Sequence, residues 1–180
     1  NVDYLFNENE PEDKEIFERI TSRTIQQRQL PVQLEDWTPR IYKMFYGIRQ
    51  LVKNIDNGSL LSNDDIVLRI RTDLHVEGCN FEVFNNLLNH VEENTVYNRL
   101  RGTDACDWFS ISTYDIFKKI WYIENNDEYN DTIKHLFNAE SIIFHKSHLN
   151  EIDIVDIHSI IELCICRHYD DKSPSLERYG

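Results

Sequence analysis

Glycine is scarce in this chain, with five residues in 180, and that scarcity argues against several classes of nucleotide-binding enzyme. Loops that wrap around phosphate groups need glycine for their tight backbone turns. The sequence contains neither GxGxxG nor GxxxxGK followed by Ser or Thr, and it also lacks HExxH and GxSxG. Rossmann-type dehydrogenases, P-loop enzymes and serine hydrolases are therefore poor candidates.

Positive charge is also in short supply. Lys and Arg number 19 against 32 Asp and Glu, which gives a net charge of −13. Such a chain repels polyanions unless a local basic patch overrides the overall field, so we expect no nucleic-acid partner. A small anionic ligand would need local arginines, a divalent cation or both.

Long apolar runs and paired cysteines are missing as well. No run approaches the roughly 18 residues needed to cross a bilayer, so no membrane span is expected. The four cysteines have no CxxC spacing, which favours reduced thiols over a zinc site. With no signal peptide in the sequence, we expect a cytoplasmic protein. The chain begins at Asn1 rather than Met, which suggests a processed product or one domain of a longer protein.

The segment Ile66–Glu77 is rich in chemistry and alternates between apolar and polar residues. In an extended strand the apolar set would pack on a core, leaving the other set on the opposite side. Arginines bind phosphate through two hydrogen bonds, and an acid with a second ligand two residues along can hold one cation. The alternative is a half-buried strand with a solvated, self-neutralising face. The apolar residues are Leu68, Ile70, Leu74 and Val76, and the polar ones are Arg69, Arg71, Asp73, His75 and Glu77.

A second cluster lies in Gly102–Ser112, where Asp104 and Asp107 precede a short aromatic strand. A carboxylate there could act as a general base or accept hydrogen bonds from sugar hydroxyls, and Trp108 offers an apolar face for a sugar ring. The alternative is that these acids cap backbone turns. A weaker metal candidate is the pair His145 and His148, although histidines on a helix are more often surface or core residues.

Periodicity predicts a single domain over residues 1–180 in which helices and strands alternate, an α/β pattern. Thr38 and Pro39 begin the most secure helix, and Ser112 with Asp115 resembles a capping box for a later one. The run 152–166 is ambiguous between strand and helix, and 172–180 is predicted to be a polar tail. The predicted strands are 2–6, 66–71 and 108–112, and the predicted helices are 15–23, 39–56, 81–91, a segment after 112, 127–137 and 140–149.

The sequence has four motifs, at residues 43–55, 64–74, 107–121 and 138–144 with 163–167, which in this order resemble the surface-polysaccharide glycosyltransferases of the WavE type. KMFYGIRQLVKNI resembles the helix before the family's central strand, and DDIVLRIRTDL is similar to a strand ending in Arg-x-Arg-Pro-Asp-Leu, with Thr72 in place of the proline. DWFSISTYDIFKKIW resembles the family's Asp-x-Phe strand and the helix after it, and NAESIIF with LCICR resembles its C-terminal part. The family's N-terminal strand has no match.

The resemblance implies a GT-A-like (Rossmann-like) sandwich with a central mixed sheet flanked by helices. It further implies transfer of a sugar from a nucleotide-sugar donor to a glycan acceptor, with Mn²⁺ or Mg²⁺ on the diphosphate. In this interpretation Asp73 and His75 would hold the metal, and Asp107 would be the catalytic base. The expected substrate-binding residues are Arg69, Arg71, Asp104, Trp108 and Arg167.

Two other functions fit the same residues. One is a non-catalytic domain that binds a glycan or a protein and keeps a degenerate transferase fold. The other is a metal-dependent phosphohydrolase, which would use Asp73, His75 and Glu77 together with Asp104 or Asp107.

Overall fold

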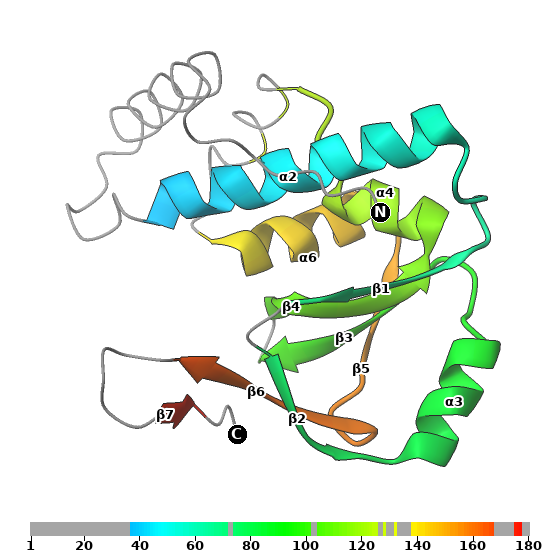
Figure 1. The fold of residues 1–180 in the computed structure, drawn as a ribbon, viewed down its shortest axis with the longest axis vertical. Coiled ribbons are helices and arrows are strands. Elements are labelled where there is room, and N and C mark those ends of the chain that lie inside the picture. The colour runs from blue at the N-terminus through cyan, green and yellow to red at the C-terminus, as the bar shows by residue number, and fades with distance from the viewer. Residues whose placement is uncertain are drawn as a thin grey trace.

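A four-stranded mixed sheet lies at the centre of the molecule (Figure 1). The computed structural model describes residues 37–71, 74–101, 104–125, 128, 132, 138–167 and 175–177. The order of the strands in this sheet is β1-β4-β3-β5. Only β3 and β5 are parallel; the other neighbours pair antiparallel. The strands are β1 (Ile66–Ile70), β3 (Thr95–Arg101), β4 (Asp104–Thr113) and β5 (Asp153–Asp156).

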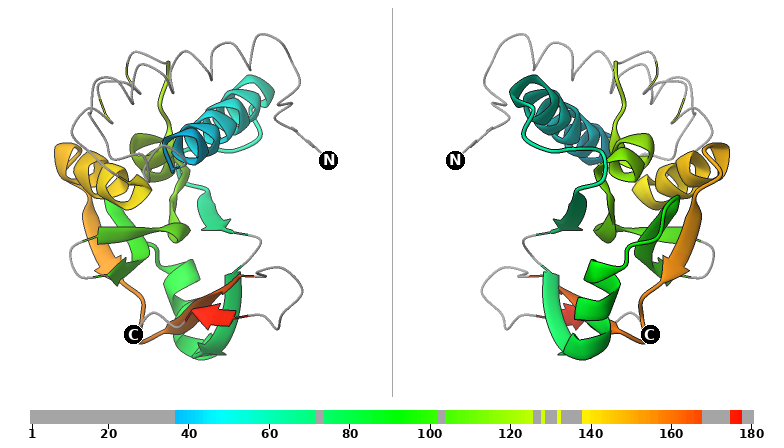
Figure 2. Two further views of the ribbon diagram at one scale, coloured as in Figure 1. Left: turned by 90° about the vertical axis from the view of Figure 1, so that its left-hand side faces the viewer. Right: turned by 90° about the vertical axis from the view of Figure 1, so that its right-hand side faces the viewer.

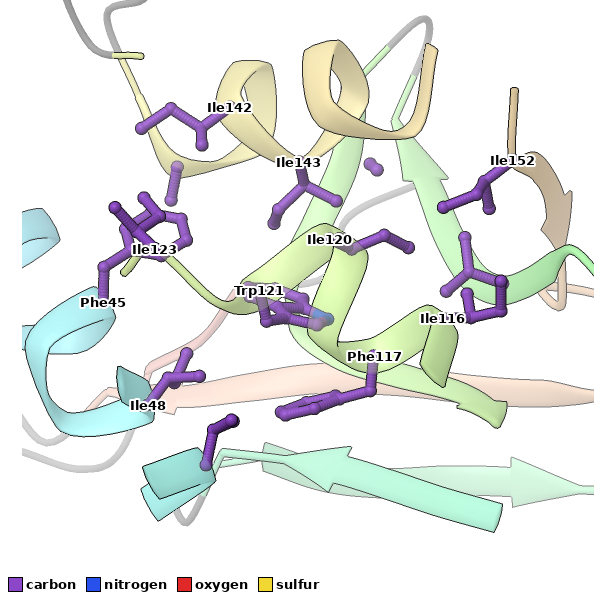
Figure 3. Packing of buried hydrophobic residues seen from close by; sticks show 14 of the residues in the cluster. Phe45, Ile48, Ile116, Phe117, Ile120, Trp121, Ile123, Ile142, Ile143 and Ile152 are labelled. Carbon is purple, nitrogen blue, oxygen red and sulfur yellow. The ribbon is translucent and has the colours of Figure 1, made fainter. Parts of the chain in front are cut away.

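Three helices cover one face of this sheet and enclose the first hydrophobic core. Apolar side chains recur at helical spacing, so each helix presents one apolar side to the sheet. Trp121 has no exposed surface and lies among side chains of the surrounding helices (Figure 3). The helices are α2 (Trp37–Gly58), α4 (Tyr114–Trp121) and α6 (Ala139–Leu149). Within the described residues, no helix is both long and apolar enough to cross a membrane.

A second, three-stranded sheet and one helix cover the opposite face of the central sheet, as the side views show (Figure 2). Its order is β2-β6-β7, and the second hydrophobic core lies between the two sheets. Neighbouring residues of β3 face opposite cores, Val96 the helices and Tyr97 the second sheet, as strand alternation requires. The elements of this layer are β2 (Leu74–Cys79), α3 (Phe81–Asn89), β6 (Ile161–Arg167) and β7 (Ser175–Glu177). The described residues thus form one mixed α/β domain.

The alternating segment Ile66–Glu77 is not one strand, and this corrects the sequence prediction. It divides into β1 in the central sheet and β2 in the second sheet. Its apolar side is also more open than predicted, since Leu68, Ile70 and Val76 are 46%, 51% and 42% exposed. β1 is an edge strand, so part of the face that it turns toward the second sheet is not covered by that sheet.

The long helix predicted over 39–56 is confirmed as α2, and the helices predicted near 81–91 and 140–149 are confirmed as α3 and α6. The cap of α4 is Thr113 rather than Ser112. The ambiguous run 152–166 contains two strands, the predicted polar tail contains β7, and β3 was not predicted. The elements predicted over 2–6 and 15–23, and most of the helix predicted over 127–137, lie outside the described residues.

The first turn of α6 depends on a side-chain cap. The Asn138 side-chain oxygen accepts a hydrogen bond from the Ser141 backbone N–H at 2.8 Å. We expect Asn138→Ala to lower the free energy of unfolding by about 1 kcal/mol, because a helix N–H loses its acceptor. Urea denaturation measures this change. The control is Asn138→Asp, which keeps the accepting oxygen; equal losses in the two variants would contradict the capping role.

Candidate functional site

Pairing between β1 and β4 joins the two segments from which the site residues were predicted. The strands run antiparallel, with Arg69 opposite Ser110 and Ile70 opposite Phe109. Beyond the end of β1, the backbone N–H of Arg71 donates to the Trp108 carbonyl at 2.9 Å. Residues almost forty positions apart in the sequence are therefore neighbours at this edge of the sheet.

A large irregularity in β4 sets the position of Asp107. On the other side of β4, Asn98 pairs with Ser110 whereas Leu100 pairs with Ala105. The four residues 106–109 therefore stand opposite a single residue of β3, Arg99. Bulges of this kind bend a strand and redirect its side chains, and they are common beside functional sites.

Arg71 and Asp107 meet where this bulge faces the end of β1. A guanidinium nitrogen (Nη1) of Arg71 lies 4.0 Å from Oδ1 of Asp107, and the two side chains are 38% and 17% exposed. An ion pair this open to solvent contributes little to stability, typically about 0–1 kcal/mol. Both groups therefore remain accessible to a polar ligand.

Arg69 lies deeper and contacts groups from three elements. Its Nη1 donates to the Asp107 carbonyl, its Nη2 lies 3.2 Å from the Met44 sulfur, and its Cζ lies 4.0 Å from the centre of the Trp121 ring. Burial lowers the pKa of Arg69 to about 10, and the nearby Asp107 carboxylate opposes this shift in part. The guanidinium is therefore a desolvated cation, and among the described residues its direct contacts include no carboxylate.

The side of β4 that faces the helices carries further hydrogen-bond donors. Ser110 and Ser112 are both 1% exposed. Among the described residues, neither hydroxyl has a hydrogen-bond partner, and the same holds for the indole N–H of Trp121. Ser110 lies directly opposite Arg69, and side chains of directly paired residues share one face of the sheet. Because these buried groups can donate hydrogen bonds, the face of β4 next to Arg69 favours a hydrogen-bond acceptor or an anion over a cation.

Cys106, at the start of the bulge, is not a candidate nucleophile. Burial raises the pKa of its thiol well above the usual range, while the backbone N–H of Trp108 acts in the opposite direction. A thiol that stays protonated is a poor nucleophile and a poor metal ligand.

The other residues named from the sequence have different outcomes. The stacking of Trp108 on a sugar stays a prediction, and its position does not favour it, since Trp108 is 6% exposed and belongs to the core between the sheets. His75 is exposed on β2, in a different sheet from Arg69. His145 and His148 are exposed on α6. Asp73 lies outside the described residues, as do the side chains of Asp104 and Arg167.

The described residues by themselves do not fit a hard divalent cation. No group of three potential ligands occurs among the Asp, Glu, His and Cys side chains in the described part of the chain. The accessible carboxylate of the site, Asp107, is paired with Arg71. Among the described side chains of the site, two guanidinium groups and one carboxylate leave a net positive charge, which suits an anionic ligand.

The sequence analysis missed three residues that shape this site. Met44 and Trp121 contact Arg69, and Asn98 holds the bulge in β4. Met44 and Trp121 carried only the signal of helix periodicity. The signal for Asn98 was the β-forming run at the start of Thr95–Arg101, with a polar residue at its centre.

Searches against protein-family models, curated proteins and solved structures found no match for this chain. Its function is therefore argued from its own residues and their geometry.

Proposed function

We propose that this chain is a glycosyltransferase domain that moves a sugar from a nucleotide-sugar donor to a glycan acceptor. One observation carries the proposal: three of the four parts of the WavE-like pattern meet around Arg69. Met44 comes from the first segment, Arg69 from the second, and Asp107 with Trp121 from the third.

The arginines would act on the departing diphosphate. Negative charge grows on this leaving group as its bond to the sugar breaks, so a fixed positive charge stabilises the transition state more than the ground state. Arg71 is exposed enough to donate two hydrogen bonds to a phosphate. Arg69 is held in place by Trp121 and Met44, and it would add positive potential from behind.

Asp107 is the proposed base. A proton would pass from an acceptor hydroxyl to its carboxylate while the hydroxyl oxygen bonds to the anomeric carbon and the bond to the diphosphate breaks. This step belongs to an inverting transfer. Asp107 is partly exposed at a bulge rather than buried in a core, so an acceptor hydroxyl can reach hydrogen-bond distance.

The Mn²⁺ or Mg²⁺ that the resemblance implies stays a prediction, because its expected ligand Asp73 lies outside the described residues. When bound, such an ion would neutralise charge on the diphosphate. The GT-A-like fold is likewise part of the proposal. The mixed sheet with helices on one face supports it in general terms, although the described residues contain only one parallel strand pair.

Thermal unfolding with nucleoside diphosphates, with and without Mn²⁺, tests this function. A ligand at 100 times its Kd adds about 2.7 kcal/mol, which corresponds to roughly 5–10 °C for a domain of this size. We expect one nucleoside diphosphate to raise the Tm, and Arg71→Ala to remove most of the increase. Without ligand, the Tm of Asp73→Ala should lie within a few degrees of that of the unaltered protein. The Tm increase caused by the nucleoside diphosphate should no longer depend on Mn²⁺ in this variant.

The same experiment separates the alternatives. A Tm that rises with glycans but with no nucleotide would favour a non-catalytic binding domain. A nucleotide effect that Arg71→Ala leaves intact would contradict the role assigned to this site.

A further inference from the structure

The bulge that presents Asp107 is held by one fully buried side chain. Asn98 has no exposed surface. Its side-chain N–H₂ donates to the carbonyls of Cys106 at 3.0 Å and of Phe109 at 2.8 Å, and its oxygen accepts from the Cys106 N–H at 2.7 Å. The amide thus bonds to both ends of the bulge.

These bonds replace what the neighbouring strand cannot provide. Because the four residues 106–109 face one residue of β3, the regular ladder of backbone hydrogen bonds is interrupted there. Buried backbone groups without partners are costly, so the Asn98 amide stabilises a backbone shape that would otherwise be unfavourable. Only an amide of this length supplies two donors and one acceptor at this position, since Asp lacks the donors and Gln is longer.

The backbone that Asn98 holds positions both the carbonyl and the carboxylate of Asp107. The Asp107 carbonyl accepts from Arg69, and its carboxylate faces Arg71. If the bulge relaxed toward a regular strand, the alternation of side chains would change and Asp107 would leave this position.

We infer that Asn98 is a positioning residue, which places the Asp107 carboxylate beside Arg71 by holding the β4 bulge. That Asn98 contributes to catalysis rests on the proposed function. That Asn98 holds the bulge rests on the hydrogen bonds described above. Asn98 touches neither donor nor acceptor in this scheme and acts through Asp107 alone.

The structural part is tested on the native protein by amide hydrogen exchange. The N–H of Cys106 is expected to exchange as slowly as core amides, because its acceptor is a fully buried side chain. In Asn98→Asp, which keeps the accepting oxygen and loses both donors, the amides of residues 106–109 should exchange at least about tenfold faster, with α6 unchanged. Rapid exchange at Cys106 in the native protein would overturn the inference, whether or not the variant folds.

The catalytic part is tested by combining substitutions. We expect Asn98→Asp to lower kcat for sugar transfer by at least about tenfold, with the KM for the donor within about twofold. In an Asp107→Asn background, the same substitution should change the residual rate by less than about twofold, because residues that act as a unit are not additive. Equal losses in both backgrounds would show a merely structural role. Asn98→Ser, which is smaller and uncharged, repeats the test if the Asp variant does not fold.

Tyr114→Phe provides a matched control for stability. Its hydroxyl donates to Asp56 at 3.0 Å, near the other end of β4, so its loss should lower the Tm and leave kcat unchanged. Absence of transfer in the unaltered protein with every donor tested would refute the proposed function, while hydrogen exchange would still decide whether Asn98 holds the bulge.

Discussion

Asp107→Asn is expected to lower the rate of sugar transfer by about 10²–10⁴-fold while the protein still folds and still binds a nucleoside diphosphate. The amide keeps the shape of the side chain but cannot accept the acceptor's proton, and general bases typically contribute about 10²–10⁴-fold to a rate. Its ion pair with Arg71 is partly exposed, so the Tm should fall by no more than a few degrees. Steady-state kinetics gives kcat, and titration calorimetry gives the Kd of the diphosphate.

Asp115→Asn is the matched control for this variant. Asp115 is an exposed acid on α4 that pairs with Lys119 at 2.7 Å, and its removal should change neither kcat nor Kd. An Asp107→Asn protein with a weakened Kd and unchanged transfer would assign Asp107 to donor binding and require another base.

Arg69→Met is expected to leave the free energy of unfolding unchanged or raised, while transfer falls by about a hundredfold or more. Burial lowers the pKa of Arg69 to about 10, which disfavours the charged form by on the order of a few kcal/mol at about 1.36 kcal/mol per unit. Met has a similar length, needs no hydration and can pack against Met44 and Trp121. An apolar side chain also avoids the cost of burying a charge that has no carboxylate bonded to it among the described residues. Urea denaturation and transfer kinetics measure the two effects.

We expect stability and activity to respond differently to this substitution because burial of the charged Arg69 guanidinium is unfavourable. Residues that a fold accommodates at such a cost are commonly functional. Arg99→Met is the contrasting control, because Arg99 is buried and lies 3.6 Å from Asp156. Its loss removes this ion pair and the hydrogen bond to the Leu100 carbonyl, and it should lower the free energy of unfolding. A large loss of stability in Arg69→Met as well would identify Arg69 as a structural residue.

Helices were predictable from this sequence because their apolar residues recur every three or four positions, as in α2 and α3. The strand at Ile66 was also predictable in place, but its environment was not. Alternation tells which residues share a side, and it does not tell which side is covered. Leu68 and Ile70 share the predicted side yet remain exposed, because β1 is an edge strand.

The candidate site was predictable only as separate parts. Arg69, Arg71 and Asp107 were all named from the sequence, but their proximity depends on the pairing of β1 with β4, which no local pattern encodes. β3 was missed because its central residues Asn98 and Arg99 interrupt the apolar alternation. Asn98 is polar and buried because of a bulge in another strand, so only the tertiary structure explains it. The burial of Trp108 was not predicted for a related reason, since an aromatic ring beside an acid can equally fill a core.

The short connection between β1 and β2 restricts insertions and deletions in this part of the chain. The Arg71 N–H is bonded to Trp108 in one sheet, and Leu74, whose N–H donates to the Arg71 carbonyl at 3.1 Å, is paired with Ile165 in the other. One residue inserted or deleted between Arg71 and Leu74 would break this hydrogen bond, which sets the spacing between the two strand pairings. Related chains are therefore expected to keep this spacing constant and to differ in length at exposed connections such as 59–65.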